Sequence, residues 1–309
     1  MSAPVTTTSG RRRRSRPGRR GASEARAGLI LALPFVVLFS VFTLWPVLQS
    51  MFMSFTDTRI TDIRTPFAVN FIGFDNYAKA LGDPVFRRAA LNTGVFVVVG
   101  VPLTIAAGLA AAVALDKGIT KFRSVFRMGF YTPVITSIVA VAVVWRFLLQ
   151  PESGLVNTVL GWVGIDGPNW LGDTRTSLLS LIIMAVWRNF GTGMIIFLAG
   201  LQAVPWALHE AASLDGASSW QRFWHITLPV LRPTFLFVMV ATTIGYLQFF
   251  EEPFVMTQGG PLNSTLSASM YTYQQFGFGN YGVAGAMAYL TFLVIVIVTV
   301  IQFRVTREK

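Results

Sequence analysis

The sequence predicts an all-α membrane protein with six transmembrane helices. Of its 309 residues, 53% are hydrophobic and 13% are charged, whereas soluble domains carry roughly 25% charged residues. Six windows of mainly apolar residues are each long enough to cross a hydrocarbon core of about 30 Å. A chain of this composition is expected to fold in a bilayer, which makes the soluble enzyme classes poor candidates.

The predicted spans follow one another along the chain, with polar or Gly- and Pro-rich segments between them. Apolar residues occupy all faces of each window, as expected for helices surrounded by lipid and by other helices. The first window is too long for a secretory signal core and lacks a small-x-small cleavage site, so we interpret it as a retained helix. The windows are residues 28–54, 91–114, 125–148, 177–200, 233–256 and 282–303.

Lysine and arginine are unevenly distributed over the segments between the spans. The first 27 residues carry eight arginines against one acid, Glu24. With the amino terminus taken as cytoplasmic, the inner segments hold 17 lysines and arginines and the outer segments hold 7. Because basic residues favour the cytoplasmic side, both termini of this cytoplasmic-membrane protein are predicted to be cytoplasmic. Residues 1–27 are interpreted as a basic cytoplasmic tail, expected to be disordered, that touches membrane lipid rather than nucleic acid.

The inner segment between the fourth and fifth spans, residues 202–233, has local signals for two short helices joined by an elbow. Pro205 suits the first turn of a helix, and Gly216 supplies the left-handed residue that ends it. Ser218 and Gln221, three positions apart, form a capping box that starts a second helix. Pro229 is expected to stop that helix.

This elbow segment resembles the EAA motif in permease subunits of binding-protein-dependent ABC importers. Fixed residue types at fixed separations make the match more specific than a short glycine motif. The matching residues are Glu210, Ala211, Ala212, Asp215, Gly216, Ala217, Phe223, Ile226, Leu228, Pro229 and Pro233. The resemblance implies that the segment is a coupling helix that enters a groove on a cytoplasmic ABC ATPase. The ATPase-coupling residues it implies are Glu210, Ala211, Ala212, Asp215, Gly216, Leu228 and Pro229.

The outer segments resemble the maltose-type carbohydrate permeases within that group. Each match alone is also an ordinary turn or loop dipeptide, but their order relative to the six spans gives them weight. The matches are residues 71–78, 83–86, 92–93 and 257–261 with Thr265. The resemblance implies a six-helix permease domain over residues 28–309, with a core transport domain at about 91–304.

The family resemblance also implies partners. A second related permease would complete the path as a heterodimer, and an extracytoplasmic solute-binding protein would deliver the sugar. Two ABC ATPase subunits would use ATP and Mg, so no cofactor is expected on this chain. The chain has no phosphate-loop, nucleophile-elbow or HExxH motif, which predicts a non-catalytic subunit.

Metal binding is also not predicted. The chain has no cysteine, which excludes thiolate sites. Its two histidines, His209 and His225, lack the spacing and the nearby carboxylates of a zinc site.

Polar residues within the spans mark a candidate path for a sugar. Arg188 lies near the middle of the fourth span, beside Asn189 and a predicted break at Gly191-Thr192-Gly193. A charge there costs at least about 2.5 kcal/mol, so it should face water or pair with a carboxylate in a structural role. Hydrogen-bonding and aromatic side chains suit a sugar. The candidate path residues are Arg188, Asn189, Tyr246, Gln248, Glu251 and Glu252.

Other functions remain open at this stage. The same architecture could import a polyol, a glycerol phosphate or an amino sugar. An ion-coupled secondary transporter would be expected to show inverted repeats and a mid-membrane carboxylate, and the sequence shows neither. A membrane-embedded enzyme would need clustered His, Asp or Glu at the membrane face, which the sequence also lacks.

Overall fold

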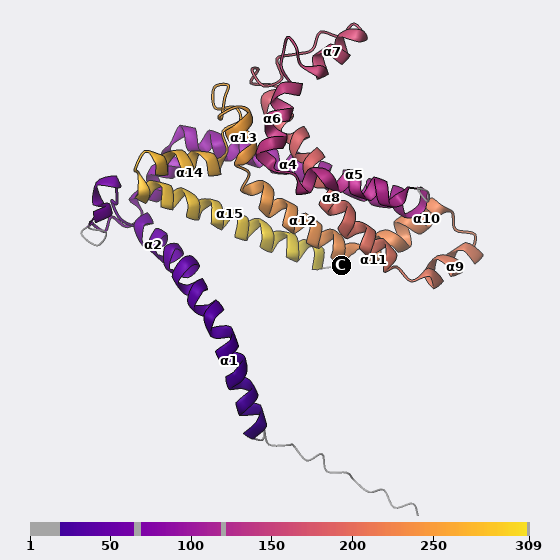
Figure 1. Cartoon of the computed structure of the whole chain (residues 1–309), viewed down its shortest axis with the longest axis horizontal. Helices are drawn as coiled ribbons and strands as arrows, with labels where there is room; N and C mark the ends of the chain where they lie inside the picture. The colour runs from indigo at the N-terminus through magenta and orange to yellow at the C-terminus, as the bar shows by residue number, and fades with distance from the viewer. Residues whose placement is uncertain (1–18, 65–68, 119–121, 308–309) are drawn as a thin grey trace, which may run out of the picture. The chain divides into compact units, whose positions relative to one another are not determined.

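The computed structural model describes residues 19–64, 69–118 and 122–307, which are almost entirely helical (Figure 1). Within these ranges the single β-type pairing is an isolated antiparallel bridge between Thr56 and Phe71. The chain divides into two compact units, residues 1–52 and residues 53–309. The predicted all-α class is therefore confirmed.

The described residues of the first unit form one long helix that contains a π-helical turn. Helix α1, Arg19–Phe39, continues through a π-helical turn, Ser40–Leu44, into α2, Trp45–Ser54. The stretch Gly28–Ser54 is apolar and long enough to cross a membrane, at the boundaries that the sequence predicts. Residues 1–18 of the predicted disordered tail lie outside the described residues, and the helix begins at Arg19, before the predicted boundary.

Three long helices of the second unit correspond to predicted spans. They are α4, Pro84–Val113, α8, Ser177–Gln202, and α15, Tyr281–Arg307. The start of α4 is set by Asp83, whose carboxylate accepts hydrogen bonds from the backbone N–H groups of Val85 and Phe86 at 2.7 and 3.3 Å. Pro84 at the first helical position has no N–H to satisfy.

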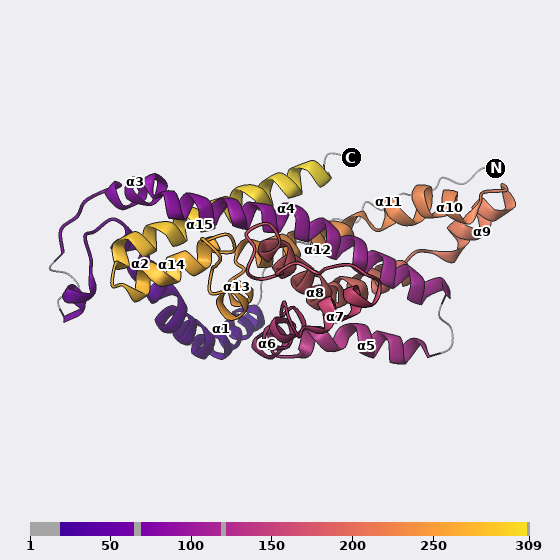
Figure 2. The same ribbon diagram turned by 90° about the horizontal axis from the view of Figure 1, so that it is seen from above.

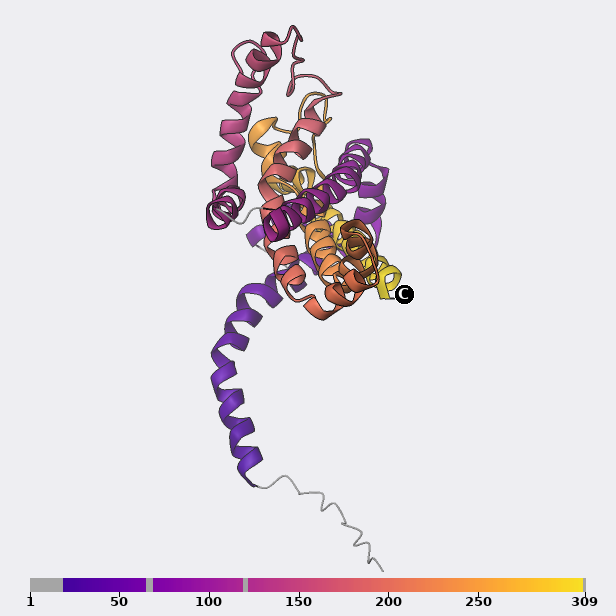
Figure 3. The same ribbon diagram turned by 90° about the vertical axis from the view of Figure 1, so that its right-hand side faces the viewer.

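The third predicted span is not one straight helix, which corrects the sequence prediction. Helices α5, Arg123–Ile135, and α6, Ile138–Leu148, meet at an angle of 98°, nearly a right angle in Figures 1 and 3. Pro133 removes one backbone donor near the end of α5, and Thr136 is extended. These two features end α5 inside an otherwise apolar window.

The fifth predicted span is also interrupted. Helix α12, Arg232–Leu247, ends at Gln248, and a separate short helix, α13, Glu251–Met256, follows. At its other end α12 meets the helical stretch Ser219–Val230 at an angle of 67°. By length and composition, four helices could cross a membrane, or up to six if each bent pair counts as one span.

The remaining helices are short and connect the spans. They are η2, Ile60–Arg64, α3, Asp75–Gly82, η3, Ala114–Gly118, α7, Leu155–Trp162, α9, Trp206–Leu214, α10, Ser219–Arg222, η4, Phe223–Thr227, α11, Leu228–Val230, and α14, Ala268–Gly277.

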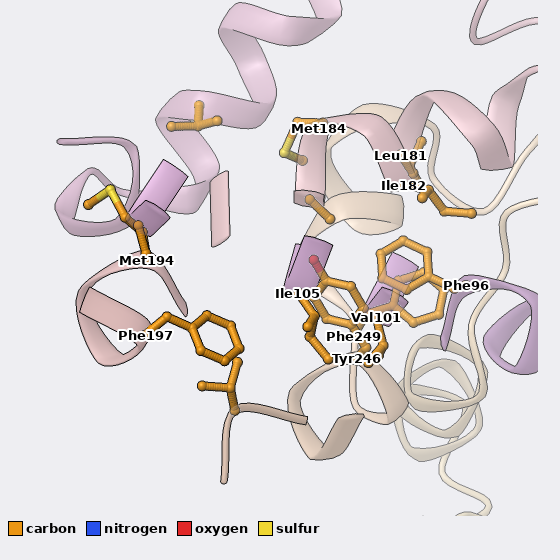
Figure 4. Packing of buried hydrophobic residues seen from close by; sticks show 14 of the residues in the cluster. Phe96, Val101, Ile105, Leu181, Ile182, Met184, Met194, Phe197, Tyr246 and Phe249 are labelled. Carbon is orange, nitrogen blue, oxygen red and sulfur yellow. The ribbon is translucent and has the colours of Figure 1, made fainter. Parts of the chain in front are cut away.

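The core of the second unit lies between α4, α8 and α12, which pack side by side (Figure 2). Small residues bring α4 and α8 close, since a Cβ atom added to Gly108 would lie 3.0 Å from the carbonyl oxygen of Phe190. Phe96 of α4 stacks on Phe249 with ring centroids 3.9 Å apart (Figure 4). Both rings are buried, so this contact ties the end of α12 to α4.

Polar contacts fasten the loop after α13 to the start of α4. The buried Asn92 side chain donates to the carbonyl oxygens of Asn263 and Leu266 at 2.7 and 2.9 Å. The hydroxyl of Tyr271 donates to the Asp83 carboxylate at 2.6 Å. Burial, together with the neighbouring Asp83 carboxylate, raises the pKa of Tyr271 to about 12.

Candidate functional site

A polar cavity of about 360 Å³ lies where α8, α12 and α13 meet the start of α6. It contains all six candidate path residues, which the sequence identifies only by their polarity. The lining residues are Ile138, Arg188, Asn189, Thr192, Ala241, Thr242, Gly245, Tyr246, Gln248, Phe249, Glu251 and Glu252. The structure therefore brings the predicted set together, while contact with a solute stays a prediction.

The end of α12 brings the two acidic residues of the cavity to its wall. Because α12 ends at Leu247, the chain turns, and Glu251 and Glu252 form the first turn of α13. Glu252 is 5% exposed, and its Oε2 atom has no hydrogen-bond partner among the described residues. A buried acceptor without a donor is costly, so this oxygen favours a ligand that can donate a hydrogen bond.

Arg188 supplies the positive charge of the cavity. Its Nη1 atom donates to Oδ1 of Asn189 at 3.1 Å, and Asn189 Nδ2 donates to the carbonyl oxygen of Ala185 at 2.9 Å. Within the described part of the chain, Arg188 forms no ion pair, and its Nε atom is buried without a partner. This conformation therefore does not show Arg188 paired with a carboxylate of the same subunit, which was the structural alternative.

The predicted break at Gly191-Thr192-Gly193 is wrong, because α8 is continuous from Ser177 to Gln202. Gly191 serves close packing instead, since a Cβ atom there would lie 2.3 Å from the carbonyl oxygen of Phe130. A Cβ atom on Gly193 would make only ordinary contacts, the nearest at 3.5 Å from Cγ1 of Val238. Thr192 between them lines the cavity.

Tyr246 is held rigidly at the cavity wall. Its hydroxyl is 2.7 Å from Oγ1 of Thr104, and its ring meets Phe96 edge-on with centroids 5.1 Å apart. A Cβ atom on Gly100 would lie 2.8 Å from the Tyr246 ring, so glycine is needed for this close contact. Figure 4 shows the ring beside Phe96 and Phe249.

Several lining residues are not among the candidates that the sequence identifies. Thr192 lies four positions after Arg188, and Thr242 lies four positions before Tyr246, so helical spacing alone places each pair on one face. Thr192 and Thr242 could therefore have been predicted from the sequence. Ile138 and Phe249 line the cavity only because the third and fifth spans are interrupted, which apolar composition does not reveal.

The elbow segment has the local structure that the sequence predicts. Helix α9 ends where Gly216 adopts φ +80°, with a hydrogen bond from the Ala217 N–H to the Ala212 carbonyl oxygen at 2.9 Å. Ser218 and Gln221 form the predicted capping box, with reciprocal hydrogen bonds of 3.3 and 2.8 Å. Pro229 does not stop the second helix as predicted, because the helical stretch continues to Val230 and bends at the next residue.

The elbow segment is largely exposed. Helix α9 buries none of its residues, and Leu214 is 86% exposed. Glu210, Ala211, Asp215, Gly216 and Pro229 are exposed, and Ala212 and Leu228 are half-buried. Figures 1 and 2 show α9 projecting beyond the ends of α8 and α12. An exposed apolar helix face of this kind is available to a partner.

Nothing in the described residues forms a metal site, since no three His, Asp or Glu side chains gather there in a suitable arrangement. The cavity offers hydrogen-bonding and charged groups to a ligand. The elbow segment offers an exposed helix to a protein partner.

Comparison with known proteins decides the family. A family model for the inner membrane component of binding-protein-dependent transport systems matches residues 100–307. The chain belongs to this family. The permease is 35% identical over 288 residues to the lactose transport system permease protein LacF of Rhizobium radiobacter, covering 91% of the chain and 94% of LacF. It is 32% identical to the trehalose/maltose transport system permease protein MalF of Thermococcus litoralis, over 93% and 95% of the two chains.

The fold of the permease is shared with a solved transporter. It resembles a chain of the bacterial alginate ABC transporter in complex with an alginate pentasaccharide-bound periplasmic protein, with a TM-score of 0.78 and 25% identity over 95% and 98% of the two chains. These similarities confirm the predicted resemblance to the carbohydrate ABC permeases. The protein is a multi-pass component of the inner membrane.

Proposed function

We propose that this permease carries a carbohydrate across the cytoplasmic membrane as one transmembrane subunit of an ATP-driven importer. The polar cavity carries the proposal, because it joins Arg188, Asn189, Tyr246, Gln248 and the two glutamates inside apolar helices. Hydroxyl groups of a sugar can both donate to Glu252 and accept from Arg188. The sugars in the names of the relatives, lactose and trehalose or maltose, support this cargo class.

ATP hydrolysis is assigned to separate subunits. The exposed α9 helix would insert into a groove on one of the two partner ATPases, which use ATP and Mg, and the chain itself would bind no cofactor. Glu210 and the small residues Ala211 and Ala212 are accessible for that contact. The Gly216 elbow would pass ATPase closure to α12 as a rigid-body movement.

A second related permease and an extracytoplasmic binding protein complete the proposed complex. The relation to a transporter solved with its periplasmic protein supports the binding protein. A heterodimer, in which the partner permease supplies the rest of the path, and cytoplasmic termini complete the proposal. Polyols, glycerol phosphates and amino sugars are the rival cargoes, because each also needs hydrogen-bonding groups.

The cavity is tested by paired substitutions assayed in the assembled transporter. Arg188→Gln and Gln248→Ala should each lower sugar uptake while ATPase assembly is kept. Arg146→Gln is the matched control, because Arg146 is an exposed arginine of α6 outside the cavity. Normal uptake by both cavity variants would overturn the proposed path.

A further inference from the structure

Helix α3 has an unusual distribution of exposed side chains. Its buried positions are Asn76 and Ala80, while Phe74 is 73% exposed and Leu81 is 57% exposed. Asn76 is held inside by donating to the carbonyl oxygens of Ser54 and Thr56 at 3.0 and 2.7 Å. The helix therefore presents large apolar side chains outward while a polar side chain faces the protein.

The outward side of α3 separates into two stripes. Phe74, Ala78 and Leu81 follow the spacing of one helix face, and Asp75 and Lys79 lie on the neighbouring face. All five residues are exposed. An exposed apolar stripe beside an exposed charged stripe is the pattern of a helix that lies in a membrane surface.

An aromatic cluster extends the apolar stripe. The Phe55 ring lies 5.4 Å from Phe74, 5.3 Å from Tyr77 and 6.3 Å from Phe71, measured between centroids. Phe71 is 73% exposed. Phenylalanine is typical of the apolar face of a helix that lies in a membrane surface, and tyrosine is favoured at the boundary between lipid and water.

The cluster lies at the ends of membrane spans. Phe55 directly follows the first candidate span, and α3 precedes α4 by one residue (Figure 2). The segment before α3 is also fastened to the start of α15, since the Gly282 N–H donates to the Thr58 carbonyl oxygen at 3.1 Å. A Cβ atom on Gly282 would lie 2.5 Å from the Thr56 carbonyl oxygen, so the two segments touch. These connections hold α3 next to the starts of α4 and α15.

The exposed charges near α3 suit phospholipid headgroups. Lys79, Arg87 and Arg88 are exposed, against one exposed acid in the same stretch, Asp75. Asp83 is engaged by Tyr271 and by the first turn of α4. Cations beside an apolar face attract anionic lipid.

We propose that α3 and the aromatic cluster Phe55, Phe71, Phe74 and Tyr77 form a surface that lies on the bilayer and binds phospholipid. The apolar stripe enters the region between headgroups and acyl chains, and Lys79, Arg87 and Arg88 contact phosphate groups. In the proposed orientation this is the extracytoplasmic leaflet. The surface would hold the starts of α4 and α15 at a fixed depth while the path opens and closes.

The absence of cysteine allows a direct test, because each introduced cysteine can be labelled uniquely. A nitroxide is placed by Ala78→Cys or Leu81→Cys on the apolar stripe, and by Asp75→Cys or Lys79→Cys on the polar stripe as matched controls. The full transporter, with cysteine-free partner subunits, is reconstituted in vesicles of phosphatidylethanolamine and phosphatidylglycerol. Collision rates of each label are measured with oxygen, which concentrates in lipid, and with a water-soluble nickel chelate.

The lipid surface predicts a higher oxygen-to-nickel ratio at residues 78 and 81 than at residues 75 and 79. Ratios that are equal and water-like on both stripes would overturn it. Labels at 78 and 81 that are shielded from both reagents would also overturn it and would indicate a protein partner. Shielding that arises only when the binding protein is added would assign the surface to that protein.

Discussion

Substitution of Gly216 tests the elbow without disturbing the packing of the spans. Gly216 has φ +80°, and no heavy atom lies within 4 Å of the position that a Cβ atom would take. A Cβ atom at this position therefore meets no neighbour, and its cost comes from the backbone conformation. Gly216→Val puts a β-branched residue in a conformation that L residues avoid, whereas Gly216→Asn uses a residue that tolerates the left-handed region.

The size of the effect follows from the backbone conformation. A left-handed conformation costs an ordinary L residue roughly 1–2 kcal/mol. A penalty of one or two kcal/mol changes the ratio of two states by a factor of about 5–30. If only the native elbow connects α9 correctly to α10, Gly216→Val should reduce uptake by a factor in this range, and Gly216→Asn should stay near wild type.

The assay compares sugar uptake with ATPase activity in reconstituted transporter carrying each variant. We expect Gly216→Val to assemble with its partners but to hydrolyse ATP without matching uptake. Equal uptake by Gly216→Val and wild type would refute the role of the elbow. A Gly216→Asn variant as poor as Gly216→Val would refute the backbone explanation, because it would show that any side chain there is harmful.

Three further substitutions test other parts of the structure. Glu210→Lys inverts an exposed charge on α9 and should weaken ATPase co-purification without lowering the amount of inserted permease. Asn92→Leu removes the donor from the buried carbonyl oxygen of Leu266, at about 1–3 kcal/mol, and from the partly buried carbonyl oxygen of Asn263, and it should lower the melting temperature in detergent. Gly191→Val places a side chain against the Phe130 carbonyl oxygen and should cost about 1–3 kcal/mol or more, seen as faster proteolysis, whereas Gly94→Val meets open space and should not.

For each of the three substitutions, one outcome would contradict the prediction. Unchanged co-purification of Glu210→Lys would remove that residue from the ATPase contact. A melting temperature of Asn92→Leu equal to wild type would mean that the loop after α13 is not fastened to α4 by these bonds. Equal protease sensitivity of the two glycine variants would contradict the close approach of α5 and α8.

Local chemistry was readable from the sequence, whereas bends within apolar segments were not. The elbow depends on Gly216 and on the Ser218–Gln221 capping box, which act over a few neighbouring residues, so their pattern predicts it. The bend after α5 has apolar residues on both sides, and only Pro133 and Thr136 hint at it. Hydropathy reports that a segment is apolar and is insensitive to its direction.

The cavity shows the same limit. Polar residues inside apolar windows identified Arg188 and Glu252 as candidates. That both line one cavity depends on the turn between Gln248 and Phe250. Packing of Phe249 on Phe96 holds that turn, and this contact joins residues far apart in the sequence. Long-range packing of this kind leaves no periodic signal in a single sequence.

Uptake into vesicles would show whether this permease works as part of an ATP-driven importer. The purified transporter is reconstituted with ATP and Mg inside, and binding protein with a radiolabelled sugar is supplied to the extracytoplasmic side in the matching orientation. We expect uptake that requires both ATP and the binding protein and that persists when ionophores collapse all ion gradients. Uptake that proceeds without ATP and stops when an ion gradient is collapsed would contradict it.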